Sequence, residues 1–140
     1  MKQKSKQASR VPLKTALLLK KCRYPRKQCD SSYFTGKTSS HLKYGELLSF
    51  PPITGNIYSV AAPTIHETMD WLRNKKDLFV EVRFVLDAHL SDLRPYRWRL
   101  VKPSKANGII CSEVGFNTYE ECCIDCIDFT LEMLSKKQKS

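Results

Sequence analysis

The residues best suited to do chemistry lie close together near the end of the sequence, in the stretch TYEECCIDCIDFTLEML. It contains Cys122, Cys123 and Cys126, so an adjacent pair of thiols overlaps a Cys-x-x-Cys spacing. That spacing occurs in redox centres, where a thiolate attacks a disulfide, and in zinc sites, where two thiolates bind the metal. The element that carries the thiols decides whether either chemistry applies.

The spacing of polar and apolar residues predicts that this element is a helix. Thr118 and Glu121 have the capping-box spacing, which predicts a helix that begins at Tyr119. At 100° per residue, the apolar arc of this helix contains Tyr119, Cys122, Cys123, Cys126, Thr130, Met133 and Leu134. The opposite side carries a row of carboxylates: Glu121, Asp125, Asp128 and Glu132. We therefore expect buried thiols and a solvated acidic row.

Burial weighs against redox or metal chemistry at these thiols. A redox Cys-x-x-Cys needs its first thiol near the helix N-terminus, and Cys123 lies beyond the first turn. A zinc ion needs four ligands; Cys111 could approach from the preceding strand, but Cys22 and Cys29 are separated by six residues and form no close pair. The pattern favours structural cysteines over a metal or redox site and predicts no cofactor.

The remaining candidates for catalysis are three histidines that share no motif, His41, His66 and His89. None accompanies a nucleophile motif, and glycine patterns that cradle phosphate are missing. His66 falls early in a capped helix and is expected at the surface. We predict no catalytic residues and a protein that is not an enzyme.

Charge is distributed unevenly along the 140 residues. The net charge of +10 belongs entirely to residues 1–62, which carry twelve Lys and Arg against Asp30 and Glu46, whereas residues 63–140 carry twelve of each sign. Clustered like charges are typical of interaction tails. The basic residues assigned to nucleic-acid phosphates are Lys14, Lys20, Lys21, Arg23, Arg26 and Lys27, with Lys2, Lys4, Lys6 and Arg10 before them.

The six cysteines would suggest a secreted disulfide framework only with a signal peptide. The short apolar run ALLL at 16–19 leads directly into KKCRYPRK, which lacks the small residues of a cleavage site. No apolar run approaches the length of a membrane span. These features predict a cytoplasmic protein that does not associate with membranes.

The sequence patterns that predict helices and strands are clearer in the C-terminal half of the chain than in the N-terminal half. Residues 1–30 are expected to form a basic, partly disordered arm, with one or two helical turns after Val11, and residues 31–62 an irregular segment packed on the domain. Alternation at 32–35 and 56–60 allows two short strands, and a loop equally. From 63 to 140 the patterns predict a helix at 64–77, strands within 78–87, 95–101 and 108–116, and the last helix.

This order predicts an α+β fold in which a three-stranded antiparallel sheet carries two helices on one face, a two-layer α-β-β-β-α sandwich. If the first two strands pair antiparallel, Glu81 and Arg83 share the exposed face with Arg97 and Arg99, where opposite charges would help to fix the register. Trp98, between the two arginines, is then expected to face inward.

In topology, residues 63–135 resemble a double-stranded-RNA-binding domain, which also runs helix, three strands, helix. That family grips phosphate with lysines at the start of its second helix. Here the corresponding stretch is NTYEECC and is acidic. The resemblance therefore implies the fold and not the RNA contacts.

A closer resemblance rests on APTIHETMDWLRNKKDLFVEV and TYEECCIDCIDFTLEML. These are similar to a family of small uncharacterised proteins of gut bacterial genomes and their phages, with an Ala-Pro-Thr opening, a Trp-Leu-Arg helix and a closing Tyr-Glu-Glu-Ala helix. Cys122 stands where that family has Ala. The resemblance implies a phage or mobile-element protein without a known activity. We expect an accessory module that binds a protein partner or, alternatively, nucleic acid through the basic arm.

Overall fold

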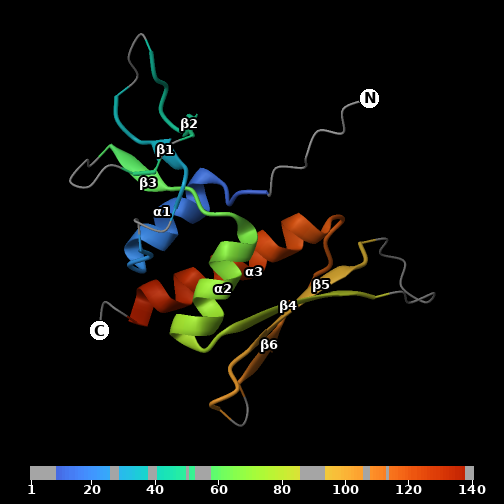
Figure 1. Cartoon of the computed structure of the whole chain (residues 1–140). Coiled ribbons are helices and arrows are strands. Elements are labelled where there is room, and N and C mark those ends of the chain that lie inside the picture. Colours follow the sequence, from blue (N-terminus) through green and yellow to red (C-terminus); the bar gives the residue numbers. More distant parts are fainter. Residues whose placement is uncertain are drawn as a thin grey trace.

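The computed structural model describes residues 9–25, 29–37, 41–49, 51–52, 58–85, 94–105, 108–112 and 114–137. These residues form a mixed α and β fold with three helices and two three-stranded antiparallel sheets (Figure 1). In chain order the elements are α1 (Leu13–Lys21), β1 (Ser32–Phe34), β2 (Leu47–Leu48), β3 (Ser59–Ala61), α2 (Ile65–Lys76), β4 (Phe79–Phe84), β5 (Tyr96–Val101), β6 (Ile109–Cys111) and α3 (Tyr119–Lys137).

The helix predicted at 64–77 is α2, and its capping box is confirmed. The Glu67 backbone N–H donates to Thr64 Oγ1 at 3.1 Å, and the Thr64 N–H donates to Glu67 Oε1 at 3.0 Å. These two bonds satisfy donors that the first turn of a helix leaves free. The helix ends at Asp77, which has a left-handed backbone with φ of 55°. Trp71 and Leu72 are buried on its inner side.

The three predicted C-terminal strands form one antiparallel sheet in the order β4-β5-β6. The register pairs Val82 with Trp98 and Glu81 with Arg99. Side chains alternate between the two faces of a strand, so Trp98 points to the core, where it is 5% exposed, and the arginines beside it point away. The predictions for the shared charged face and for Trp98 are confirmed.

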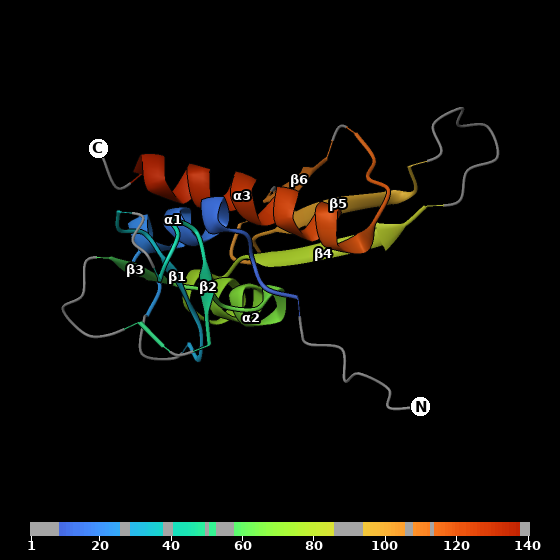
Figure 2. The same cartoon turned by 90° about the horizontal axis from the view of Figure 1, so that it is seen from above.

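The last helix, α3, joins the two halves of the molecule. One part of α3 packs on β4 and β5, and the helix then continues past the sheet to contact α1 (Figure 2). Cys122, Cys123 and Cys126 are each 0% exposed, as are the adjacent Ile127 and, one turn later, Leu131. The predicted burial of the three thiols is confirmed, and the Glu121 N–H donates to Thr118 Oγ1 at 3.1 Å as the predicted cap requires.

The N-terminal region differs from the predicted arm. Val11, Leu19 and Cys22 are 0–1% exposed and belong to the same core cluster as Ile127 and Leu131. The sequence predicts an arm here because α1 is short and strongly basic. One side of α1 is nevertheless apolar, and that side packs on the second half of α3. Residues 11–25 are therefore part of the domain; residues 1–8 lie outside the described residues.

Arg10, included among the basic residues of the predicted arm, also has a structural partner. Its Nη2 lies 2.9 Å from a carboxylate oxygen of Asp30, and its Nη1 donates to the carbonyl oxygen of Ala62 at 2.7 Å. These contacts connect the segment before α1 to the segments that precede β1 and α2. Arg10 is therefore occupied within the fold.

The segment 31–62 contains strands rather than only loop. The strand expected at 32–35 is β1, and the one expected at 56–60 is represented by β3, although residues 53–57 lie outside the described residues. Both pair antiparallel, with Tyr33 opposite Val60, and β2 extends the sheet on the other side of β1. Val60 is buried in the core, which joins this second sheet to α1.

Candidate nucleic-acid interface

Burial keeps the thiols of α3 protonated. It raises the pKa of Cys122 to about 12 and that of Cys126 to about 12, from an ordinary value of 9.0, and raises the pKa of Cys123 as well. Burial also raises the pKa of Cys29 to about 11, with the neighbouring Glu67 carboxylate acting in the same direction. A thiolate is the reactive form of cysteine, so these positions are suited to packing and not to nucleophilic chemistry.

The thiols should consequently differ in their reactivity with an uncharged thiol reagent such as N-ethylmaleimide. Cys111 is exposed on β6 and is expected to react within seconds, whereas Cys122, Cys123 and Cys126 should react only as the protein unfolds. Mass spectrometry of partially labelled protein at pH 8 would assign each site. Rapid labelling of α3 in the folded protein would contradict the burial described above.

The raised pKa values also predict how stability depends on pH. The Cys126 thiol stays neutral in the folded chain up to a pKa of about 12, whereas in the unfolded chain it ionises near 9.0. Its contribution to stability is therefore complete below pH 9 and is lost as pH rises from there toward 12. Cys126→Ala should flatten the alkaline loss of stability, measured by urea unfolding at a series of pH values. An unchanged slope would contradict the shift.

The acidic row of α3 is exposed, as predicted, except at the half-buried Asp128, and two of its carboxylates also bind neighbouring elements. Asp125 accepts a hydrogen bond from Trp98 Nε1 at 2.8 Å, and Asp128 accepts one from Thr15 Oγ1 at 2.6 Å. Burial raises the pKa of Asp128, although the Thr15 bond and the nearby Lys14 lower it. These carboxylates fasten α3 to the sheet on one side and to α1 on the other.

Neither histidines nor a metal cluster provides an alternative site in the described part of the chain. His41 and His66 are exposed, as expected for His66, and His89 lies outside the described residues. The described residues contain no group of three or more His, Cys, Asp and Glu side chains placed to hold a metal ion. Among the described helices, none is long and apolar enough to cross a membrane.

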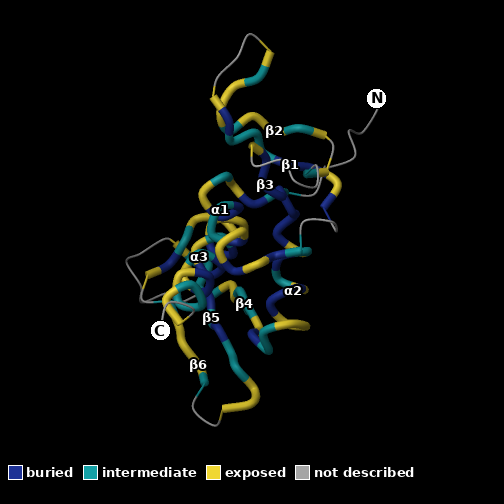
Figure 3. The backbone as a smooth tube through the Cα atoms, turned by 90° about the vertical axis from the view of Figure 1, so that its left-hand side faces the viewer, coloured by how far each residue is buried: buried dark blue, intermediate teal, exposed yellow. Residues whose placement is uncertain are grey.

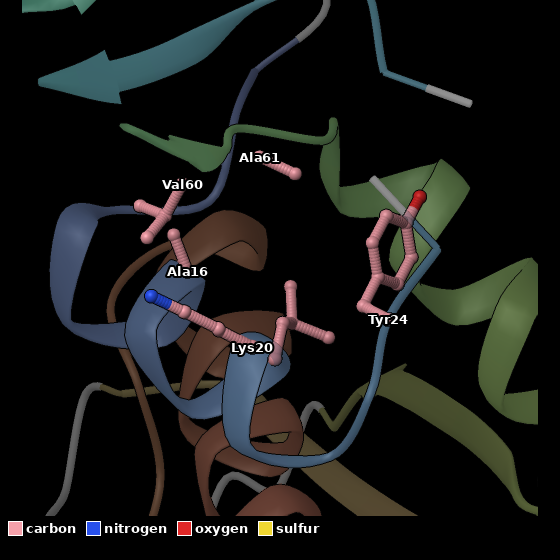
Figure 4. Close-up of a pocket in the computed structure, with 6 residues that line it drawn as sticks. Ala16, Lys20, Tyr24, Val60 and Ala61 are labelled. Carbon is pink, nitrogen blue, oxygen red and sulfur yellow. The ribbon is translucent and has the colours of Figure 1, made fainter. Parts of the chain in front are cut away.

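One enclosed recess is present between α1 and β3, and it is too small for a ligand. Its volume is about 10 Å³, which is at the lower limit for a single water molecule. Ala16, Val60 and Ala61 line it, and Lys20 extends across it toward Ala16 and Val60, so that its aliphatic stem covers apolar surface (Figure 4). This recess is a packing feature of the core.

The basic residues that the sequence assigns to nucleic acid are separated by the fold. Lys14 lies in the first turn of α1 near Asp128, whereas Lys20 and Lys21 lie in its last turn and Arg23 immediately follows. All four are exposed. Two further candidates lie outside the described residues: Arg26 and Lys27.

The last turns of all three helices are basic, and they lie on the same side of the molecule. Cys22, at the end of α1, donates its thiol hydrogen to the Leu131 carbonyl oxygen of α3 at 3.4 Å. Burial raises the pKa of this thiol, and the nearby charge of Lys76 on α2 acts in the opposite direction. The C-terminal ends of the helices lie on one side of Figure 1, which faces the viewer in Figure 3.

We call this side the basic end. Its members are cations from the last turns of α1, α2 and α3 and from the second residue after α1: Lys20, Lys21, Arg23, Arg73, Lys75, Lys76, Lys136 and Lys137. Arg73 is paired with Asp70 on the same helix, and Lys76 lies 5.5 Å from the centre of the Trp71 ring.

A structural explanation accounts for part of this arrangement. A lysine in the last turn interacts favourably with the partial negative charge of its own helix, by about 0.3–1 kcal/mol. That effect requires no convergence, because it operates within each helix. Cations from three helices on one side of the molecule give that side a positive potential, which attracts an anionic ligand. The arrangement is therefore suited to binding a polyanion.

Arg23 occupies a backbone conformation that favours glycine. Its φ is 65°, in the left-handed region. The Arg23 N–H donates to the Lys20 carbonyl oxygen at 3.1 Å, and the Tyr24 N–H donates to that of Leu19 at 3.0 Å, which is the Schellman pattern that ends many helices at a glycine. An arginine here costs about 1 kcal/mol relative to glycine. Strained residues tend to lie at functional sites, and this one lies at the basic end.

Arg23→Gly should therefore separate stability from binding. We expect the substitution to stabilise the fold by about 0.5–1 kcal/mol, because the left-handed conformation is unstrained for glycine. It should also weaken binding to a polyanion, since it removes an exposed cation. Urea unfolding and a binding titration on the same preparation would check both. A destabilised variant would contradict the backbone assignment, and unchanged binding would place Arg23 outside the interface.

Sequence reasoning missed the contributions of α2 and α3 to this surface. Lys75, Lys76 and Lys136 belong to the half of the chain with no net charge, so a count by halves conceals them. The basic residues at the end of each capped helix were the sequence signal that could have identified this surface. Comparison of the chain with protein-family models, with curated proteins and with solved structures finds no match.

Proposed function

We propose that this chain is a non-enzymatic protein that binds the phosphate backbone of nucleic acid through the basic end. The observation that carries the proposal is that the basic last turns of three helices lie on one side of the molecule. Lysine and arginine contacts to phosphate supply affinity without reading sequence. In this proposal the cations that contact phosphate belong to folded helices, whereas the sequence places them on a flexible arm.

The arrangement supports backbone contacts rather than base recognition. Lys21, Lys75 and Lys136 are exposed charges on flexible stems at the rim of a folded domain. Lysine binds phosphate as a point charge and not in the fixed planar geometry with which arginine reads a guanine edge. About five phosphate contacts would give a slope of log K against log salt near −3.5 for a single strand and near −4.5 for a duplex.

The direct experiment is a salt series with the full chain. Fluorescence anisotropy of labelled single-stranded and duplex DNA, at salt from about 50 to 200 mM, should show binding that weakens steeply as salt increases. Absence of salt-sensitive binding to both forms would rule out the proposal.

A second candidate function, the accessory module that binds a protein partner, is favoured by the apolar edge of the C-terminal sheet. Ile109 and Ile110 of the edge strand β6 are 54% and 39% exposed. An exposed edge strand can pair with an extended segment of another protein. The salt series discriminates the two functions, because strand pairing at this edge predicts no salt-sensitive binding of nucleic acid.

The proposal also includes the detailed architecture, the origin and the location that the sequence predicts. The order α2-β4-β5-β6-α3 supports a two-layer α-β-β-β-α unit within the larger fold. The resemblance in the two helix motifs supports a phage or mobile-element origin, and the residue pattern supports a cytoplasmic location. A protein of this kind would use non-specific nucleic-acid affinity to stay close to its genome or transcript.

A further inference from the structure

The outer face of the β4-β5-β6 sheet, which points away from α3, is organised in rows across the strands. The register places one row of apolar residues, one row with an ion pair and one row of arginines on this face. From the α2 end outward the rows are Phe79–Val101–Ile109, Glu81–Arg99–Cys111 and Arg83–Arg97. Four residues along a strand separate the first row from the last, a distance of roughly 14 Å.

In the middle row, the positive charge of an arginine is neutralised by an ion pair across the strands. Arg99 lies directly opposite Glu81, and its Nε donates to Glu81 Oε2 at 2.8 Å while its Nη2 donates to the same oxygen. Opposite charges facing each other across strands stabilise a sheet by about 0.2–1 kcal/mol. The carboxylate of Glu81 is therefore engaged with Arg99.

The last row has the opposite arrangement. Arg83 lies directly across from Arg97, so two like charges face each other. Among the described residues neither arginine has a hydrogen-bond or ion-pair partner. Directly opposed like charges destabilise a sheet, and a guanidinium pair is well matched to the oxygens of a bound phosphate. Within the described part of the chain this row carries two positive charges and faces no carboxylate, so it is suited to binding an anion.

The first row supplies an aromatic surface. Phe79 is 36% exposed and is flanked by Val101 and by Ile109, which is 54% exposed. An exposed ring on an open sheet face can stack on an unpaired base, a contact that tolerates any sequence. Phe79 also follows the end of α2 by three residues, so this row adjoins the basic end at Lys75 and Lys76.

From this geometry we propose that the outer sheet face binds single-stranded nucleic acid, with Phe79 stacking on a base and the Arg83–Arg97 pair holding a phosphate further along the strand. This inference rests on the proposed function and names its substrate class. A strand held by the lysines of α2 would continue across the sheet. A duplex would gain little here, because its bases are already stacked and a nearly flat face does not reach into a groove.

The test compares the binding of labelled oligothymidylate and of a duplex of equal length by the full chain and its variants. Arg83→Gln/Arg97→Gln should weaken single-strand binding about twentyfold and change duplex binding less than twofold. Phe79→Leu, which keeps apolar surface but removes the ring, should weaken single-strand binding about fivefold. The matched control, Lys37→Gln/Lys43→Gln, removes the same charge from exposed positions around β1 and β2 and should preserve the preference for the single strand.

Each outcome decides between readings. Salt-sensitive binding without a preference for the single strand, or an equal loss in the arginine variant and its control, would overturn this inference and leave the proposed function standing. Absence of nucleic-acid binding by the unaltered chain would overturn both. Equal binding of polyglutamate, lost in the arginine variant, would assign the face to an acidic protein instead. Thermal unfolding completes the test, since a marked drop in Tm for the arginine variant would mean that the pair is structural.

Discussion

Lys21→Glu/Lys75→Glu is expected to bind nucleic acid roughly a hundredfold more weakly than the unaltered chain at about 100 mM salt. Both side chains are exposed at the basic end, one from α1 and one from α2. Reversal of the charge removes two phosphate contacts and adds repulsion, so the effect exceeds that of neutral substitutions. Fluorescence anisotropy across a salt series would measure both the affinity and the reduced slope.

The control for this prediction is a charge reversal of equal size elsewhere. Lys37→Glu/Lys43→Glu changes exposed residues around the second sheet and is expected to weaken binding only a fewfold, through the reduced net charge. If both variants lost affinity equally, binding would depend on total charge and not on the basic end.

A chain that begins at residue 63 is expected not to fold cooperatively. Truncation removes Val11, Leu19 and Val60, which are 0–1% exposed in the core. Each fully buried side chain of this kind contributes about 1.5–3 kcal/mol. Loss of several of them, and of Cys22 against α3, approaches the whole stability of a small domain, about 5–15 kcal/mol. Ile127 and Leu131 would then be exposed to solvent.

Urea unfolding followed by circular dichroism, together with binding of the dye ANS, would check this expectation. The truncated chain should lack a sigmoidal transition and bind the dye. A chain without residues 2–8, which precede the described structure, serves as the control and should keep its transition. Cooperative unfolding of the truncated chain would restore the boundary at residue 63 that the sequence suggests.

The C-terminal part of the fold follows from local patterns. The capping pair Thr64 and Glu67 fixes the start of α2, and alternation of polar and apolar residues specifies β4 and β5, because one face of each strand is buried. The same alternation correctly predicts that Glu81 shares a face with Arg97 and Arg99, and the structure adds that it lies opposite Arg99. These elements are predictable because neighbouring residues along the chain determine them.

The role of α1 could not be read in this way. Its nine residues carry Lys14, Lys20 and Lys21 around an apolar side of two turns, a pattern too short to distinguish from an isolated amphipathic segment. What decides its position is α3, which contacts α1 and carries the buried Ile127 and Leu131. A helix buried by a partner distant in sequence requires the tertiary structure.

The basic end illustrates the same limit for the candidate site. The sequence indicates that Lys21 and Arg23 are available, yet it assigns them to a flexible arm. Their meeting with Lys76 depends on the packing of Cys22 between helices, and no local pattern encodes that packing. The left-handed backbone of Arg23 is likewise visible only in the folded chain.

Lysine acetylation of the full chain, with and without bound oligonucleotide, tests the central claim most directly. Brief treatment with acetic anhydride followed by mass spectrometry reports the reactivity of each lysine. We expect bound nucleic acid to protect Lys21, Lys75, Lys76 and Lys136 and to leave Lys37 and Lys43 as reactive as in the free protein. Protection of Lys37 and Lys43 with full reactivity at Lys21 and Lys75 would show that nucleic acid binds elsewhere and would contradict the account.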